Sequence, residues 1–154
     1  MRSSIFRTMF IVLVLAFLIL GCASQEEGVP VTSEEEGPDI LQVSGAVSSA
    51  TGFSEKALRD LGTQDVQFTE KSGDVSTYTG VLIMDVLEEA GLNADASFVV
   101  FVADDGYEAE ATLEEVQGCG DCIVALQEDG SLKVVMPGFS GKLQVKGLVE
   151  IQVK

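Results

Sequence analysis

Two cysteines that could do chemistry together, Cys119 and Cys122, stand in the run Cys-Gly-Asp-Cys. Two intervening residues, one of them glycine, allow a turn that brings the two sulfurs to bonding distance. The residues are compatible with a structural disulfide, a redox-active dithiol or one half of a metal site. We expect the disulfide, because Asp121 disfavours a reactive thiolate and the sequence offers no second pair of ligands.

Histidine is absent from the whole sequence. This absence removes the commonest general base and the commonest metal ligand, and it excludes any Ser-His or Cys-His nucleophile pair. We therefore assign no catalytic residue and no metal ligand from the residue types alone. Whether the protein is an enzyme stays open at this point.

The chain opens with two arginines and then an unbroken apolar run over residues 9–20. This run is shorter than the roughly 20 apolar residues that a bilayer span needs, and it has the length of a signal-peptide core. It ends in Ile19-Leu20-Gly21-Cys22, which resembles the lipobox of bacterial-type lipoproteins. We expect a signal peptide over 1–21 and a lipid on Cys22 that anchors the protein to the cell membrane, facing the extracytoplasmic side. The alternative is an uncleaved signal anchor with a chance cysteine.

An acidic segment over residues 22–39 separates this leader from the rest of the chain. It has almost no large apolar side chain, so it cannot bury enough surface to order itself, and we expect a flexible tether. The whole chain carries a formal charge of −16, which argues against a nucleic-acid partner because phosphate binding needs a basic face. Residues 40–154 are long enough for one folded domain with its own core.

The apolar pattern of this domain indicates an α+β fold, a mixed sheet with a few short helices. Helices are expected over 55–61, capped by Ser54, and over 82–90, ended by Gly91. Gly80 is expected to end the strand that begins at Val75, and Phe98 and Phe101 are expected in the core. The other strands are expected at 41–47, 66–68, 97–103, 107–112, 123–126, 132–136 and 148–153.

The order of short motifs along this domain resembles the molybdopterin-binding domain of the sulfite oxidase family. The motifs are Tyr78-Thr79-Gly80-Val81-Leu82, Ala103-Asp104-Asp105-Gly106-Tyr107, Ile123-Val124-Ala125-Leu126, Pro137-Gly138 and Val145-Lys146-Gly147-Leu148-Val149-Glu150-Ile151. The resemblance covers roughly residues 41–154. It implies the sulfite oxidase fold, a molybdopterin cofactor and oxidoreductase chemistry.

The resemblance also implies a binding segment over residues 137–146, which in the family helps to hold the phosphate and pterin of the cofactor. Here Gly141 lets backbone amides approach an anion, Ser140 offers a hydroxyl, and Lys142 and Lys146 supply positive charge. These four residues are our candidate cofactor-binding residues. An ordinary surface loop with solvated lysines is the alternative. Phe139 and Tyr107 could line the same cleft, although packing in the core or in a strand explains each of them as well.

The sequence departs from the family at the metal. Family enzymes ligate molybdenum with a cysteine placed before the segment that matches Tyr78-Thr79-Gly80, and residues 66–77 contain no cysteine. A hard carboxylate or a serine does not replace that soft ligand. We therefore expect a binding or accessory module of the cell envelope that takes a small anionic ligand. The alternative is an oxidoreductase that works through a bound pterin or through Cys119 and Cys122. The protein partner is unknown.

Overall fold

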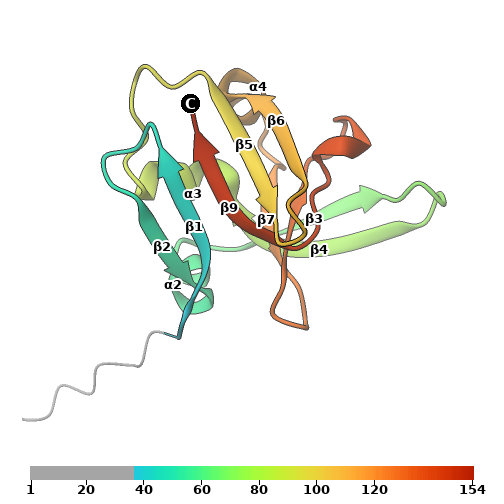
Figure 1. Ribbon diagram of the computed structural model, residues 1–154. Coiled ribbons are helices and arrows are strands. Elements are labelled where there is room, and N and C mark those ends of the chain that lie inside the picture. The colour runs from blue at the N-terminus through green and yellow to red at the C-terminus, as the bar shows by residue number, and fades with distance from the viewer. Residues whose placement is uncertain (1–36) are drawn as a thin grey trace, which may run out of the picture. The chain divides into compact units, whose positions relative to one another are not determined.

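The computed structural model describes residues 37–154, and the leader, Cys22 and most of the tether lie outside the described residues. Figure 1 shows the described part as strands with short helices between them. The helices are α2 (Glu55–Asp60), α3 (Ile83–Glu89), α4 (Leu113–Gln117) and the 3-10 turn η1 (Gly141–Leu143). The strands are β1 (Asp39–Gly45), β2 (Thr51–Ser54), β3 (Gln64–Thr69), β4 (Val75–Leu82), β5 (Phe98–Ala103), β6 (Glu108–Thr112), β7 (Ile123–Leu126), β8 (Leu132–Val135) and β9 (Leu148–Val153).

The strands form two sheets, and the α+β fold class predicted from the sequence is confirmed. A five-stranded sheet has the order β2-β1-β9-β5-β6 and is mixed, because β1 and β9 run parallel while its other pairs are antiparallel. A four-stranded antiparallel sheet has the order β3-β4-β7-β8. In Figure 1 the β3–β4 hairpin extends from the rest of the domain as a long two-stranded arm.

Two apolar clusters hold these sheets together. The larger cluster contains Leu41 and Phe101 of the five-stranded sheet, Val124 of the four-stranded sheet, and Val86 of α3. The smaller cluster lies on the other face of the four-stranded sheet, around Ile123 and other side chains of β3, β7 and β8. Both faces of the four-stranded sheet are therefore apolar along part of their length. No helix in the described range is long and apolar enough to cross a membrane.

Local signals position several of these elements, and those at Ser54 and Gly91 are as expected. The Ser54 side chain accepts a hydrogen bond from the Ala57 amide and so caps α2. Gly91 has a φ of +76° directly after the C-terminal cap of α3, a backbone conformation that glycine adopts without strain. Helix α4 begins with a capping box between Thr112 and Glu115. These caps fix where each helix meets its neighbouring strand.

Two expectations about the strands are wrong. Gly80 does not end a strand: β4 continues through it to Leu82 and pairs there with β7. A β-carbon at Gly80 would lie 2.3 Å from the carbonyl oxygen of Val124, so the glycine allows β7 to approach β4 closely. Phe98 is not in the core but 42% exposed, because it stands at the first position of β5; Val100, on the same face further along the strand, is 2% exposed.

Candidate anion-binding site

Successive side chains of a β-strand point to opposite faces of the sheet, and this alternation places a buried lysine beside two aromatic rings on one face of the four-stranded sheet. In β8, Leu132 and Val134 belong to the larger apolar cluster, so Lys133 projects to the opposite face with Val135. In β3, Phe68 lies on that same face, and the next residue but one is Glu70 at the hairpin turn. Lys133 is only 5% exposed, which makes it the one buried charged residue of the described range.

Lys133 has three kinds of partner in this environment. Its ammonium donates to the Tyr78 hydroxyl at 2.6 Å and lies 3.3 Å from a Glu70 carboxylate oxygen. It also lies 3.9 Å from the centroid of the Tyr78 ring and 5.6 Å from that of Phe68. The Tyr78 hydroxyl donates in turn to the same Glu70 oxygen at 2.5 Å. A buried charge needs such partners, because an isolated ammonium loses its hydration without compensation.

A second lysine lies beside Lys133 because the chain after η1 pairs with the free edge of β8. The Val134 amide donates to the Val145 carbonyl at 2.7 Å, and an antiparallel bridge joins Lys133 to Lys146. The Gln144 side chain closes the same edge: it accepts from the Met136 amide at 3.1 Å and donates to the Met136 carbonyl at 2.8 Å. Directly opposed strand residues have their side chains on the same face, so the two lysines are neighbours.

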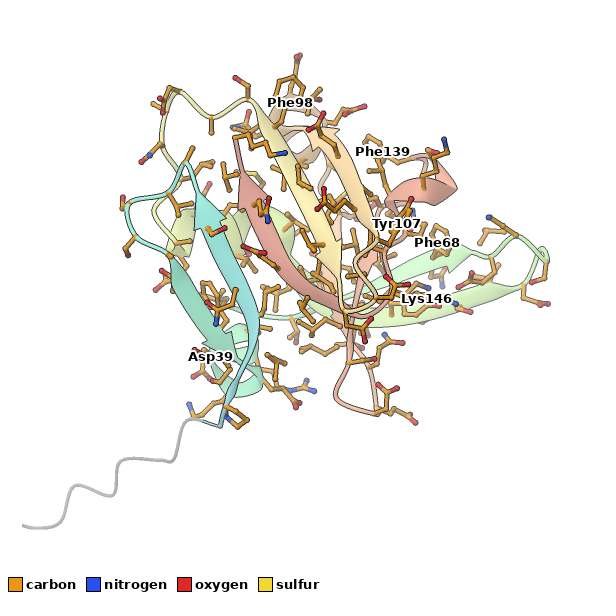
Figure 2. The ribbon with its side chains drawn as sticks, viewed as in Figure 1. Asp39, Phe68, Phe98, Tyr107, Phe139 and Lys146 are labelled. Carbon is orange, nitrogen blue, oxygen red and sulfur yellow. A yellow bond between two sulfur atoms is a disulfide. The ribbon has the colours of Figure 1, made fainter. Side chains whose placement is uncertain are left out.

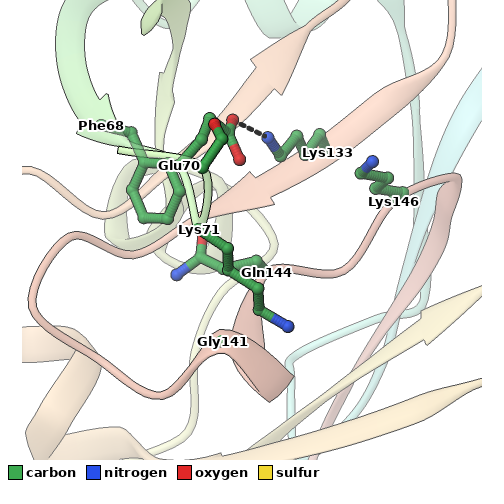
Figure 3. Close-up of a pocket in the computed structure, with 8 residues that line it drawn as sticks. Phe68, Glu70, Lys71, Lys133, Gly141, Gln144 and Lys146 are labelled. Carbon is green, nitrogen blue, oxygen red and sulfur yellow. Dashed lines mark hydrogen bonds and ion pairs between the residues drawn. The ribbon is translucent and has the colours of Figure 1, made fainter. Parts of the chain in front are cut away.

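These side chains surround a cavity of about 400 Å³, which we call the lysine cavity (Figure 3). It lies where the β3–β4 hairpin meets the segment after β8, and Figure 2 shows Phe68 and Lys146 at this junction. Lys71 and Ser72 of the hairpin turn complete its wall. The cavity is lined by Phe68, Glu70, Lys71, Ser72, Lys133, Gly141, Gln144 and Lys146. The two segments that the family resemblance singles out, 66–77 and 137–146, therefore converge on one cavity.

The structure places two of the four candidate cofactor-binding residues in the wall of the lysine cavity and two outside it. Gly141 and Lys146 line the lysine cavity, whereas Ser140 and Lys142 are exposed on η1 beside it. The Ser140 hydroxyl accepts from the Lys142 amide at 3.4 Å, which starts the 3-10 turn. The Tyr107 hydroxyl donates to the Lys142 carbonyl at 3.0 Å and so holds this turn in place.

Phe139, in the same loop, packs against the larger apolar cluster. Its ring therefore anchors the loop to the core, which agrees with the predicted packing role of Phe139. Tyr107 is 44% exposed and immediately precedes β6, so its contact with the loop comes from the turn between β5 and β6.

The cavity is electropositive within an acidic protein. Among residues 37–154, ion pairs join Lys56 to Asp60, Arg59 to Glu55, Lys133 to Glu70 and Lys154 to Glu110. Lys71 and Lys146 form no ion pair with a carboxylate in that range. Two lysines without an ion-pair partner in that range, beside a third that is buried, favour an anion in the space between them.

Lys133, Lys71 and Glu70 were missed as site residues in the sequence analysis. A signal for Lys133 was present, since it interrupts the apolar run of residues 132–136 in a strand. Lys71 and Glu70 had no such signal, because their place depends on how far the β3–β4 hairpin extends and on which strand it lies against. The hairpin turn holds them through backbone hydrogen bonds between Glu70 and Asp74 and between Gly73 and Glu70.

The surroundings of Glu70 shift the pKa of its carboxyl group. The hydrogen bond from the Tyr78 hydroxyl, and then the Lys133 ammonium, hold the pKa of Glu70 below its usual range, while partial burial opposes them. A lowered pKa in the folded state means that Glu70 stabilises the fold above the usual carboxyl pKa of about 4.3 and loses this contribution as the pH falls through the lowered value.

We therefore expect Glu70→Gln to lower the free energy of unfolding at pH 7 by about 1 kcal/mol or less, since the Glu70 side chain is 32% exposed. The difference between wild type and variant should shrink as the pH falls below about 4. Urea unfolding at several pH values measures it. A difference that grows towards acid would contradict the assigned network.

Cys119 and Cys122 form a disulfide, as predicted, with their Cα atoms 5.5 Å apart. The bridge joins the end of α4 to the start of β7, away from the lysine cavity, and Cys122 is only 1% exposed. Gln64 of β3 donates to the Gly120 carbonyl within the bridged turn at 3.0 Å. The bridge thus holds closed the turn that connects α4 to β7.

Because the bridge encloses so few residues, it removes little entropy from the unfolded chain. Cys119→Ser/Cys122→Ser should therefore cost on the order of 1–2 kcal/mol of unfolding free energy and leave the fold intact. Thermal unfolding followed by circular dichroism, with the wild type under reducing conditions for comparison, measures the loss. A variant that fails to fold would mean that the bridge has a larger structural role.

The cavity does not fit the metal that the family resemblance implies. Within residues 37–154 no three His, Cys, Asp or Glu side chains are grouped so that they could hold a metal ion. Both cysteines of that range are bonded to each other, so neither offers a thiolate. The lysine wall does fit a phosphate-like anion, whose oxygens accept charge-assisted hydrogen bonds from ammonium groups.

Comparison with known proteins supports the fold and the family resemblance. The sequence model of the oxidoreductase molybdopterin binding domain matches residues 41–154. Among solved structures, the crystal structure of the sulfane dehydrogenase SoxCD from Paracoccus pantotrophus is similar, with a TM-score of 0.57 and 16% sequence identity. The matched region covers 73% of this chain and 37% of that chain, so this chain spans well under half of that protein's length. No curated protein sequence matches.

Proposed function

The chain belongs to the oxidoreductase molybdopterin binding domain family, and from this premise we propose that it is a lipid-anchored accessory module of the cell envelope. In this proposal the domain binds a small anionic ligand in the lysine cavity and does not itself carry out molybdenum chemistry. Fold similarity alone would not support such a role, because one fold hosts many functions. Support for this role comes from the residues of the cavity.

The observation that carries the proposal is the composition of the lysine cavity. Its wall presents three ammonium groups, from Lys71, Lys133 and Lys146, in a chain whose formal charge is −16. Its hairpin segment, 66–77, carries no cysteine, although family enzymes hold their metal through one in this position. These features support a domain that binds an anion in the lysine cavity without ligating molybdenum.

Elemental and pterin analysis tests the proposal. Protein purified from its native host should contain far less than one molybdenum or tungsten atom per chain, because no soft ligand is available in the cavity. Mass spectrometry of the denatured protein identifies any released pterin, and a family enzyme that has the cysteine serves as the positive control. About one molybdenum per chain together with a released pterin would overturn the accessory role.

The competing function is an oxidoreductase, and the family membership itself favours it. It would work through a bound molybdopterin or through Cys119 and Cys122. The first version needs a thiolate for the metal, and both cysteines among residues 37–154 are bonded to each other. The second needs an accessible sulfur with a lowered pKa, whereas Cys122 is buried and Asp121 is the charge nearest in sequence. The metal analysis decides the first version, and the activity of the double serine variant decides the second.

The membrane anchor is the part of the proposal that depends on the leader. Cys22 is the proposed lipid attachment site, and the lipid would hold the domain on the extracytoplasmic side of the cell membrane. A nucleic-acid partner is not proposed, in view of the charge of −16.

Cys22→Ser should therefore move the domain from the membrane fraction to the soluble fraction, or leave an unprocessed precursor. Fractionation of cells followed by immunoblotting measures this, and Cys119→Ser/Cys122→Ser serves as the control that removes cysteines elsewhere. If the Cys22→Ser protein stays with the membrane at its mature size, a lipid on Cys22 is not the anchor.

A further inference from the structure

Glu70 is the one carboxylate among the residues that line the lysine cavity. Every other charged side chain of that wall is a lysine. Figure 3 shows the Glu70 carboxylate directed towards Lys133, with the ion pair between them drawn as a dashed line, and Lys146 on the far side of Lys133. An anion that enters the cavity therefore meets a negative charge already placed against the most buried cation.

The Glu70 carboxylate is held in this position from two directions. The Tyr78 hydroxyl donates to one of its oxygens, and the Lys133 ammonium lies 3.3 Å from the same oxygen. Its backbone is fixed by the hairpin turn, in which the Glu70 amide donates to the Asp74 carbonyl at 2.8 Å. The side chain is still 32% exposed, whereas that of Lys133 is 6% exposed. The carboxylate can therefore turn towards solvent, while the ammonium stays in the wall.

We propose that Glu70 is an internal competitor that sets the anion affinity of the lysine cavity: it supplies the counter-charge of Lys133 in the ligand-free protein, and a bound anion takes over that role. The proposal rests on the anion-binding function proposed above. It explains why a lysine can remain buried without a ligand, since a buried charge requires a partner at all times. It also makes Glu70 a determinant of which anions bind, because only a ligand with enough negative charge outweighs the carboxylate.

Electrostatics gives the size of the effect. Glu70 and an anion that contacts Lys133 would stand about 5 Å apart and repel each other, and at a partly exposed site this repulsion is worth roughly a factor of 10 in affinity. Glu70→Gln removes the charge and keeps an oxygen that accepts from Tyr78 and Lys133. The variant should therefore bind sulfate about 5- to 10-fold more tightly than the wild type.

The experiment is a calorimetric titration of the purified full-length protein with sodium sulfate at pH 7 and constant ionic strength. Sulfate is chosen because its charge does not change near neutral pH. The matched control is Glu89→Gln, which removes the same charge from the exposed end of α3, outside the cavity. The control should bind sulfate within about twofold of the wild type, because a screened surface charge contributes little.

A second variant guards against misfolding of the first. Tyr78→Phe keeps the ring that faces Lys133 but removes the hydroxyl that holds the Glu70 carboxylate. It should tighten sulfate binding as well, by about 2- to 3-fold, because the carboxylate is then less firmly placed in the cavity. Circular dichroism spectra of both variants establish that they are folded.

The outcomes separate this inference from the proposed function. Tighter binding by Glu70→Gln supports it, as does binding by the variant where the wild type shows none. Unchanged or weaker binding by Glu70→Gln, or an equal gain from Glu89→Gln, overturns it and leaves the anion-binding function standing. Absence of binding by wild type, Glu70→Gln and Tyr78→Phe alike overturns the anion-binding function, and this inference with it.

Discussion

Lys71→Ala/Lys146→Ala is expected to weaken sulfate binding by at least about 10-fold. The two lysines face the cavity and form no ion pair among residues 37–154, so their charge is available to a ligand. A hydrogen bond to a charged group contributes about 1.5–3 kcal/mol, and the loss of even half of this at each position gives that factor. The fold should be unaffected, because both side chains are at the surface.

The matched control for this variant is Lys56→Ala/Lys154→Ala, which changes the net charge by the same amount. Neither residue lines the lysine cavity: Lys56 on α2 pairs with Asp60 at 2.6 Å, and Lys154 pairs with Glu110 at 4.0 Å. Calorimetry should find sulfate affinity within about twofold of the wild type for this control. If the two double variants lose affinity equally, the anion responds to the overall charge of the protein and not to the cavity.

Gly80→Ala is expected to cost about 3 kcal/mol of unfolding free energy or more, enough to threaten folding of the domain. The new methyl group would lie 2.3 Å from the Val124 carbonyl oxygen and 2.7 Å from the Ala125 Cα atom, and both are backbone atoms of the paired strand β7. A backbone that is hydrogen-bonded in a sheet cannot move aside cheaply. β4 would have to separate from β7 at this point, which disturbs the sheet that carries Tyr78 and Lys133.

Gly120→Ala is the control for this prediction, since a β-carbon there has open space around it. Its cost should stay within about 0.5 kcal/mol. Urea unfolding of both variants measures the difference. A cost for Gly80→Ala below about 1 kcal/mol would mean that β4 and β7 are not as close as described.

Much of the fold follows from local patterns. The caps Ser54 and Gly91 and the strands β6 and β7 all lie where the sequence placed them. Local rules failed at Gly80 and Phe98 because both outcomes depend on tertiary packing. The sequence does not distinguish a glycine that ends a strand from one that allows a neighbouring strand to approach closely. An apolar run does not indicate which of its residues lies at an exposed end of the strand.

The site was harder to predict than the fold. Lys146 and Gly141 were found through the family resemblance, because they lie in one continuous segment. Lys133 and Glu70 are far apart in the chain and meet only because β3, β4, β7 and β8 pair in that order. That order depends on long-range strand pairing, which no local pattern encodes. The family resemblance therefore pointed to the wall that Gly141 and Lys146 form, and local patterns did not place Glu70 and Lys133 opposite it.

The most direct test of the account is a ¹⁵N NMR titration of the protein with sulfate, which reports both whether an anion binds and where. The account predicts saturable shifts of the amides of Lys71, Gly141 and Lys146, with small changes over β1 and β2 on the other sheet. It also predicts that Lys71→Ala/Lys146→Ala moves the midpoint of the Gly141 shift to a sulfate concentration at least about 10-fold higher. Shifts that spread evenly over exposed lysines without saturating, or that centre on Cys119 and Cys122, would contradict an anion site in the lysine cavity.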